Sequence, residues 1–191
     1  MRQCLGWLQR IKPESKPVQG TGLPRISHPV LMRQTERGDT SMFTKGFNKY
    51  ACDGDSITCT VEGFDCTATI YHDDCGDRPD ERDDGFWPSL DPKSAGYIGE
   101  KSKSTLARQT AKAKEVMAAW ERDEWWYVGV AVTVSKNDIQ LTGRFDHACW
   151  GVDCNYPGSD NSYLMDIANE ELGSALAAAR EAIAGLVEVE P

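Results

Sequence analysis

The chain has 191 residues, of which 40% are hydrophobic and 27% are charged, and its formal net charge is −9. This length allows one hydrophobic core, and the composition is too apolar for a wholly disordered protein. No stretch approaches the roughly 18 consecutive apolar residues of a membrane span, and no apolar segment with a cleavage site follows the first Met. We therefore expect a soluble cytoplasmic protein with no membrane partner.

The charge divides the chain into two parts. Residues 1–45 hold eight Lys/Arg and three Asp/Glu, whereas residues 46–191 hold 13 Lys/Arg and 27 Asp/Glu. The first part also contains four prolines and shows no sustained hydrophobic period. We therefore predict a flexible basic extension over 1–45 and a single acidic domain over 46–191. An over-extended gene start is one explanation of the extension, and a basic arm for an anionic partner is the other.

The first regular elements form a predicted β-hairpin. Residues 56–61 and 64–71 alternate β-branched with other side chains on either side of Glu62-Gly63, a pair typical of a tight turn. Cys59 and Cys66 fall on the apolar side of this pattern, so we expect both in the core. The proline-broken residues 72–103 predict a long loop.

The second half predicts two helices and three further strands. Ser102 or Ser104 caps a helix that ends near Arg122, and a second helix begins after Asn161 or Ser162 and runs to about Val187. The strongest strand pattern is the alternation of residues 126–134. The predicted strands are 126–134, 139–141 and 147–153. The order ββαβββα favours an α+β fold in which two helices cover one face of a mainly antiparallel sheet.

Acidic side chains are densest in residues 72–84, where seven acids accompany two arginines. Three interpretations are open: a solvated loop, a calcium loop, or a phosphate-mimicking surface that occupies a basic groove of a protein partner. The spacing lacks the central Gly and terminal Glu of an EF-hand loop. The predicted partner-binding residues are Asp73, Asp74, Asp77, Asp80, Glu81, Asp83 and Asp84.

Direct nucleic-acid binding is not expected, because a body of this acidity repels phosphates. Five cations do gather at the first helix, and we interpret them as a solvated helix face. They are Lys101, Lys103, Arg108, Lys112 and Lys114.

Cysteine and histidine residues raise a zinc hypothesis. Structural zinc sites usually include a C-x2-C knuckle, and no such pair occurs here. Cys149 and Cys154 would also face opposite sides of a regular strand. We therefore assign no metal and no cofactor, and expect the seven cysteines to be reduced thiols. The six residues of this set are Cys66, His72, Cys75, His147, Cys149 and Cys154.

No catalytic motif stands out in the sequence. His147 and Cys149 share a strand face, but a nucleophilic Cys also needs a lowered thiol pKa and an orienting third group. We therefore name no catalytic residue and do not predict an enzyme.

Three segments carry a resemblance to a known family. They are WGVDCNYPGSDNSYL at 150–164, KYACDGDSITCTVEGF at 49–64 and DEWWYVGV at 123–130. The chain resembles a family of uncharacterised proteins carried by phages, plasmids and genomic islands of Proteobacteria, often near antirestriction-type genes. The resemblance covers about residues 46–187 and excludes 1–41. It implies a setting in the cytoplasm of a bacterial host and carries no catalytic residues.

This setting favours a non-catalytic accessory protein that inhibits a host defence system, of the CRISPR or restriction type, by protein–protein binding. Two alternatives stay open. One is a Cys/His metal-binding module or metal-dependent enzyme, and the other is a regulatory or maintenance protein of the mobile element.

Overall fold

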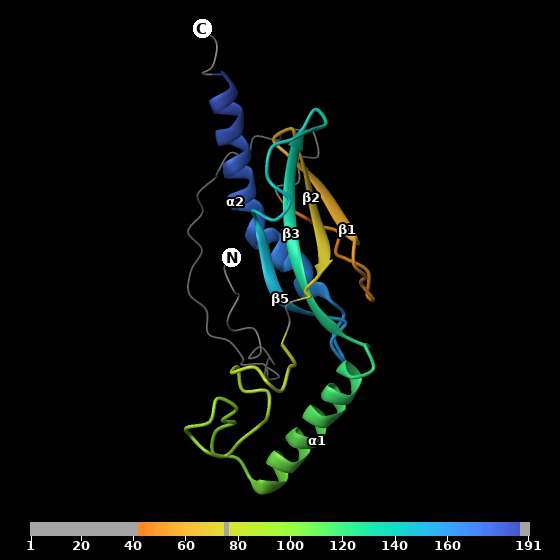
Figure 1. Ribbon diagram of the computed structural model, residues 1–191, viewed down its shortest axis with the longest axis vertical. Coiled ribbons are helices and arrows are strands. Elements are labelled where there is room, and N and C mark those ends of the chain that lie inside the picture. The colour runs from red at the N-terminus through yellow and green to blue at the C-terminus, as the bar shows by residue number, and fades with distance from the viewer. Residues whose placement is uncertain (1–41, 75–76, 188–191) are drawn as a thin grey trace, which may run out of the picture.

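The computed structural model describes residues 42–74 and 77–187 (Figure 1). Most of the predicted basic extension, residues 1–41, lies outside the described residues. The elements, in chain order, are β1 (Ser56–Val61), β2 (Phe64–His72), α1 (Lys103–Trp120), β3 (Trp126–Lys136), β4 (Ile139–Gln140), β5 (Ala148–Cys154) and α2 (Ser162–Val187). The predicted order ββαβββα and the α+β class are confirmed.

The five strands form one antiparallel sheet in which β3 is central. β1 pairs with β2, and β2 pairs with β3. The other edge of β3 is shared, because β4 pairs with its C-terminal end and β5 with its N-terminal half. The β1–β2 hairpin turns at Glu62 and Gly63, which have φ angles of 53° and 74°. Such positive angles match the right-handed twist of the strands, so the turn fixes the register of Cys59 opposite Cys66.

The main core lies between the sheet and α2 (Figure 1). The even-numbered valines of β3 point toward the helix, and the apolar stripe of α2 packs on them. Cys66 is buried in the core as expected, whereas Cys59 is half-buried and packs against the core from its edge. The α2 side chains in this core include Leu164, Ile167, Ala168, Leu172, Ala175, Leu176 and Ala179.

A β-bulge changes the phase of β5. The pairing shifts between Val128↔Val152 and Val130↔Cys149, and Gly151 has a φ of 74°. Because the extra residue resets the alternation, Cys149 and Cys154 are both buried in the main core. The expectation that they face opposite sides was therefore wrong. It assumed a regular strand.

Of the two helices, α2 covers the sheet and α1 extends beyond the ends of the strands (Figure 1). Its buried residues, Val116, Met117 and Ala119, all lie in its C-terminal third. There the indole Nε1 of Trp125 donates a 2.9 Å hydrogen bond to the Val116 carbonyl. The first half of α1 offers mainly alanines and polar side chains, which gain little from burial against a sheet. None of the described helices is long and apolar enough to cross a membrane.

Candidate partner-binding surface

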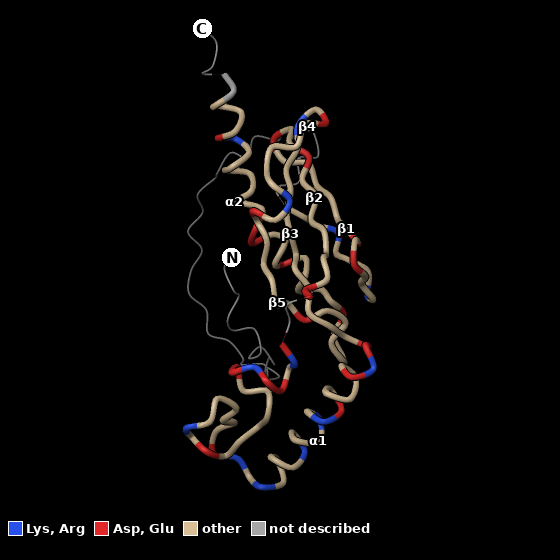
Figure 2. Tube along the Cα trace, in the orientation of Figure 1, with Lys and Arg blue, Asp and Glu red and all other residues tan. Residues whose placement is uncertain are grey.

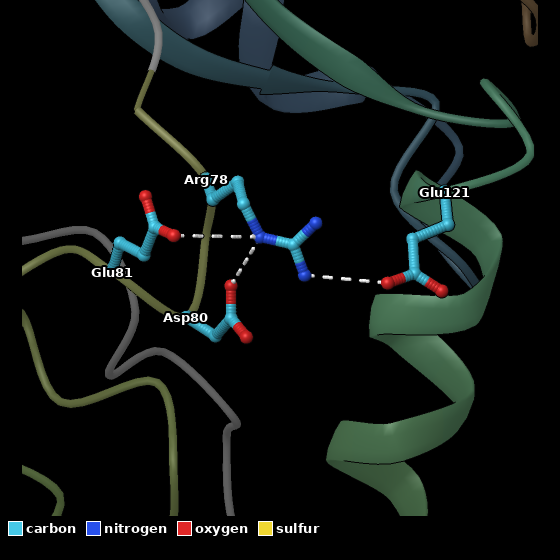
Figure 3. A network of polar contacts seen from close by, with 4 residues as sticks. All are labelled: Arg78, Asp80, Glu81 and Glu121. Atoms are coloured by element: carbon cyan, nitrogen blue, oxygen red, sulfur yellow. Dashed lines mark hydrogen bonds and ion pairs between the residues drawn. The ribbon is translucent and has the colours of Figure 1, made fainter.

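The acidic segment, residues 73–84, leads away from the end of β2, and its two arginines attach it to the domain. Residues 75 and 76 lie outside the described residues. Arg78 anchors the segment to the C-terminal end of α1 (Figure 3). Its Nη2 donates a 3.2 Å hydrogen bond to Glu121 Oε1, and its guanidinium carbon lies 5.4 Å from the Trp120 ring centroid. Its Nε lies 3.1 Å from Asp80 Oδ1 and 3.8 Å from Glu81 Oε1.

Arg82 provides the second anchor, on the sheet face that α2 leaves uncovered. Its guanidinium carbon lies 4.7 Å from the centroid of the Tyr127 ring on β3. Its Nε is 3.0 Å from Asp84 Oδ2. A guanidinium can stack on an aromatic face while its fork holds a carboxylate. Arg82 therefore fixes this part of the segment against β3.

Asp153 of β5 lies in register with Tyr127 beneath this anchor. Burial raises the pKa of the Asp153 carboxyl to about 6, an effect that the positive charge of Arg82 reduces and the negative charge of Asp84 increases. No described residue donates a hydrogen bond to this carboxyl group, whereas the hydroxyl of Tyr163 donates to the Asp153 backbone carbonyl at 2.5 Å. A half-buried acid of this kind weakens the fold when it is charged.

Tyrosines surround the Asp153 carboxyl group. Burial, reinforced by the charge of Asp153, raises the pKa of Tyr127 to about 12 and also raises the pKa values of Tyr156 and Tyr163. All three phenols are therefore protonated at neutral pH. The cluster therefore places one acid beside three protonated hydroxyl groups.

The seven predicted partner-binding acids divide into two groups. Asp80 and Asp84 pair with the anchoring arginines, Asp74 contacts His72 Nδ1 at 2.9 Å, and Asp73 Oδ2 accepts a 3.0 Å hydrogen bond from the Gly151 amide. Asp73, Asp80 and Asp84 hold the segment in place, whereas Asp74 contacts a residue only two positions away and its side chain is 93% exposed. The remaining three also have exposed side chains: Asp77, Glu81 and Asp83.

Charge of the same sign continues on the neighbouring end of α1. Glu121, Asp123 and Glu124 are exposed and lie next to the Arg78 anchor, with Arg122 among them. Figure 2 shows acidic and basic positions interspersed in this region. Counted together, the acids outnumber the arginines, so this end of the domain presents a net negative surface.

The Cys/His set is dispersed over the described part of the chain. His147 Nδ1 lies 3.1 Å from Ser174 Oγ, and the Cys154 thiol lies 3.8 Å from the Ala51 carbonyl oxygen. Among the described residues, no group of three or more His, Cys, Asp or Glu is placed to hold a metal ion. Cys75 lies outside them. Cys149 is disulfide-bonded, which corrects the expectation of seven reduced thiols.

No family model, curated protein or solved structure matches the chain. The candidate surface is therefore interpreted from its own geometry.

Sequence reasoning located the acidic segment but not its anchors. It treated the two arginines as exceptions in an acidic run, and it did not single out Tyr127 or Asp153. The sequence did hold one signal of the anchors, which is the presence of two arginines among the acids. Arginines at 78 and 82 within an acidic loop can reach carboxylates and aromatic faces. Which ring or carboxylate each one reaches depends on tertiary contacts.

Proposed function

We propose that this chain is a non-catalytic binding protein whose acidic segment occupies a basic groove on a partner protein. The observation that carries the proposal is the double anchor, with Arg78 on α1 and Arg82 on β3. A solvated loop loses conformational entropy when it binds, whereas an anchored segment has already lost part of it. The anchors thus pre-organise three exposed carboxylates.

Grooves that bind nucleic acid are lined with Lys and Arg, and carboxylates can take the place of phosphates in them. Long-range attraction between such surfaces raises the rate of association more than it raises affinity. The family resemblance adds the setting of a mobile element. We therefore propose a host defence complex of the CRISPR or restriction type as the partner and inhibition by occupancy as the mechanism.

The proposal is tested by neutralising the exposed acids while the anchors are kept. The variant D77N/E81Q/D83N removes three charges without touching an arginine contact shorter than 3.8 Å. Bacteria that express the wild-type chain should lose interference against a phage or plasmid challenge for at least one restriction or CRISPR system. Interference should return with the triple variant, because the surface no longer attracts the basic groove.

The matched control neutralises three exposed acids elsewhere on the domain, in the variant D138N/D166N/E181Q. It changes the net charge by the same amount, so it should keep full inhibition. Inhibition that survives in D77N/E81Q/D83N, or that is lost equally in the control, contradicts the role of the acidic segment. A wild-type chain that inhibits none of the systems contradicts the proposed partner class.

A further inference from the structure

The charges of α1 are distributed against the dipole of the helix. The N-terminal end of a helix is the positive end of its dipole, so acids are favourable there and cations are favourable at the C-terminal end. In α1 the first turn has no acid and the last turn has no base. The exposed cations are Lys101, Lys103, Arg108, Lys112 and Lys114, and the exposed acids that follow are Glu115, Glu121, Asp123 and Glu124. This order lowers the stability of the helix itself and indicates another role for the charges.

The cationic half of α1 has no acidic partner within the described part of the molecule. None of the ion pairs there includes one of its five cations. Lys103 is 18 residues from Glu121, or about 27 Å at 1.5 Å per residue, so these two cannot pair within one helix. Lys112 lies only three residues before Glu115, but no ion pair joins them in the described part of the chain. Figure 2 shows Lys and Arg along the half of α1 that is distant from the sheet.

Small side chains occupy the centre of the exposed face of α1. Ser104, Ala107 and Ala111 are exposed and Ala118 is half-buried. Spacings of three, four and seven residues place them on one side of the helix. Lys114 shares this side, three residues after Ala111 and four before Ala118, and its side chain is exposed. A second helix could therefore approach most closely around Ala107 and Ala111.

Charged residues of opposite sign flank this face. Lys103 and Glu121 are five turns apart and lie on one flank, while Arg108 and Glu115 are two turns apart and lie on the other. Each flank thus carries a cation toward the N-terminus and an acid toward the C-terminus. A helix that runs in the opposite direction with the same sequence has the complementary order.

We propose that α1 forms an antiparallel, two-fold symmetric pair with α1 of a second copy of this chain. In a pair centred near Ala111, Lys103 faces Glu121 of the partner subunit and Arg108 faces Glu115 of the partner subunit. Symmetry repeats each contact, so two kinds of ion pair give four contacts. Nucleic acid fits this face less well, because the acidic half of α1 and the net charge of −9 repel phosphates. The inference uses none of the acids at 73–84 and shares with the proposed function only Glu121, which Arg78 contacts.

Sedimentation velocity of the full chain over a concentration series tests the pairing. We expect a monomer–dimer equilibrium that weakens in about 1 M NaCl, where the Debye length falls to about 3 Å. K103E/R108E should raise the dimer Kd about tenfold or more, because four attractive contacts become repulsive. E115K/E121K should have the same effect. E115K alone, which leaves the Arg78–Glu121 contact in place, should have a smaller one.

The decisive measurement is an equimolar mixture of K103E/R108E with E115K/E121K. Each variant repels its own copies, but one now carries acids at all four positions and the other carries cations, so the mixture should form a heterodimer about as tight as the wild-type dimer. A misfolded variant would not recover in this way. The control K45E/K49E reverses two exposed lysines elsewhere and should dimerise like the wild type.

Three results would overturn the pairing. They are a wild-type chain that is monomeric at every concentration, a dimer whose Kd the reversals do not change, and folded variants that fail to associate with each other. Fluorescence anisotropy with a labelled DNA duplex tests the alternative, which is that nucleic acid binds the exposed face of α1. A monomeric wild-type chain that binds the duplex, with binding lost in K103E/R108E, would assign the face to nucleic acid instead.

Discussion

The guanidinium of Arg82 lies over the ring of Tyr127, 4.7 Å from its centroid, and so connects the acidic segment to the central strand. The same side chain is 3.0 Å from Asp84 and reduces the pKa rise of Asp153. The Arg82 guanidinium thus interacts electrostatically with two carboxylates and stacks on one aromatic ring. This arrangement makes Arg82 the residue on which the position of the acidic segment depends most directly.

We expect Arg82→Gln to lower the free energy of unfolding by about 1–2 kcal/mol, because the variant loses the stacking on Tyr127 and leaves two acids without their cation. Urea denaturation measures this loss. The control is Arg180→Gln, which removes an exposed pair with Glu62 and should cost less than about 0.5 kcal/mol. Equal losses in the two variants would mean that Arg82 is an ordinary surface arginine.

The contribution of Asp153 to the free energy of unfolding should depend on pH in the direction opposite to that of an ion-paired acid. Its folded-state pKa of about 6 lies above the ordinary value of 3.8, so the folded state binds the proton more tightly than the unfolded state does. The contribution of Asp153 to stability therefore falls as pH rises from about 4 to about 6, and stays low at higher pH. Two pKa units correspond to at most about 3 kcal/mol.

Asp153→Asn removes this charge. We expect the variant to melt at a higher temperature than the wild type at pH 7–8, by an amount equivalent to about 1–3 kcal/mol. The difference should disappear as pH falls through 6 toward 4, because the wild-type carboxyl is then neutral as well. Melting curves at several pH values measure this difference in melting temperature. The control is Asp138→Asn, a variant in an exposed turn. A difference that is constant with pH would contradict the assignment.

Local sequence patterns were sufficient to predict most elements of the fold. Glu62-Gly63 allowed a tight turn, and the alternation of residues 126–134 allowed only a strand. Each of these features is encoded within about ten residues of chain. The place of α1 was not, because its modest apolar stripe did not reveal that only its last turns are buried.

The candidate surface was predictable in composition but not in geometry. The acids at 73–84 are visible as a cluster, whereas their attachment joins residues 43 and 45 positions apart, Arg78 to Glu121 and Arg82 to Tyr127. The alternation of side chains along a strand also does not predict the bulge at Gly151. Because of this bulge, Asp153 faces Tyr127 rather than the main core. Such contacts depend on tertiary structure, which the local hydrophobic periodicity of the sequence does not predict.

The third prediction concerns Asn161, whose side chain connects three parts of the chain by hydrogen bonds. Its side chain is buried and its φ is 60°. Its Nδ2 donates to the Lys49 carbonyl at 3.1 Å and to Asn155 Oδ1 at 2.7 Å, while its Oδ1 accepts from the Asn155 amide at 2.9 Å. The side chain therefore joins β5 and the start of α2 to the chain before β1.

Asn161→Asp keeps the shape of this side chain but replaces its two donors with an acceptor. We expect a loss of about 2–4 kcal/mol in unfolding free energy at pH 7, because two carbonyl oxygens lose their donor and a charge is buried. The loss should shrink at low pH, where the new acid is neutral. Asp160→Asn, at an exposed cap position, is the control and should cost less than about 1 kcal/mol. A small, pH-independent effect of Asn161→Asp would show that the network contributes little.

The four free cysteines of the described residues should differ widely in reactivity. Cys52 is exposed, whereas burial raises the pKa of Cys59 and raises the pKa values of Cys66 and Cys154 to about 12. The thiolate is the form that reacts, so a rise of about three pKa units removes about 99.9% of it at a given pH below the ordinary value. Limited access in the core slows the reaction further.

Alkylation of the native chain with iodoacetamide, followed by peptide mass spectrometry, measures these rates. Cys52 should react at least about 100-fold faster than Cys66 or Cys154, and Cys59 should fall between them because it is half-buried. In urea all four should react at similar rates, since unfolding removes both the burial and the pKa difference. Rapid labelling of Cys66 in the native chain would mean that β1 separates from β2 often enough to expose the thiol, and the hairpin would then be the least stable part of the sheet.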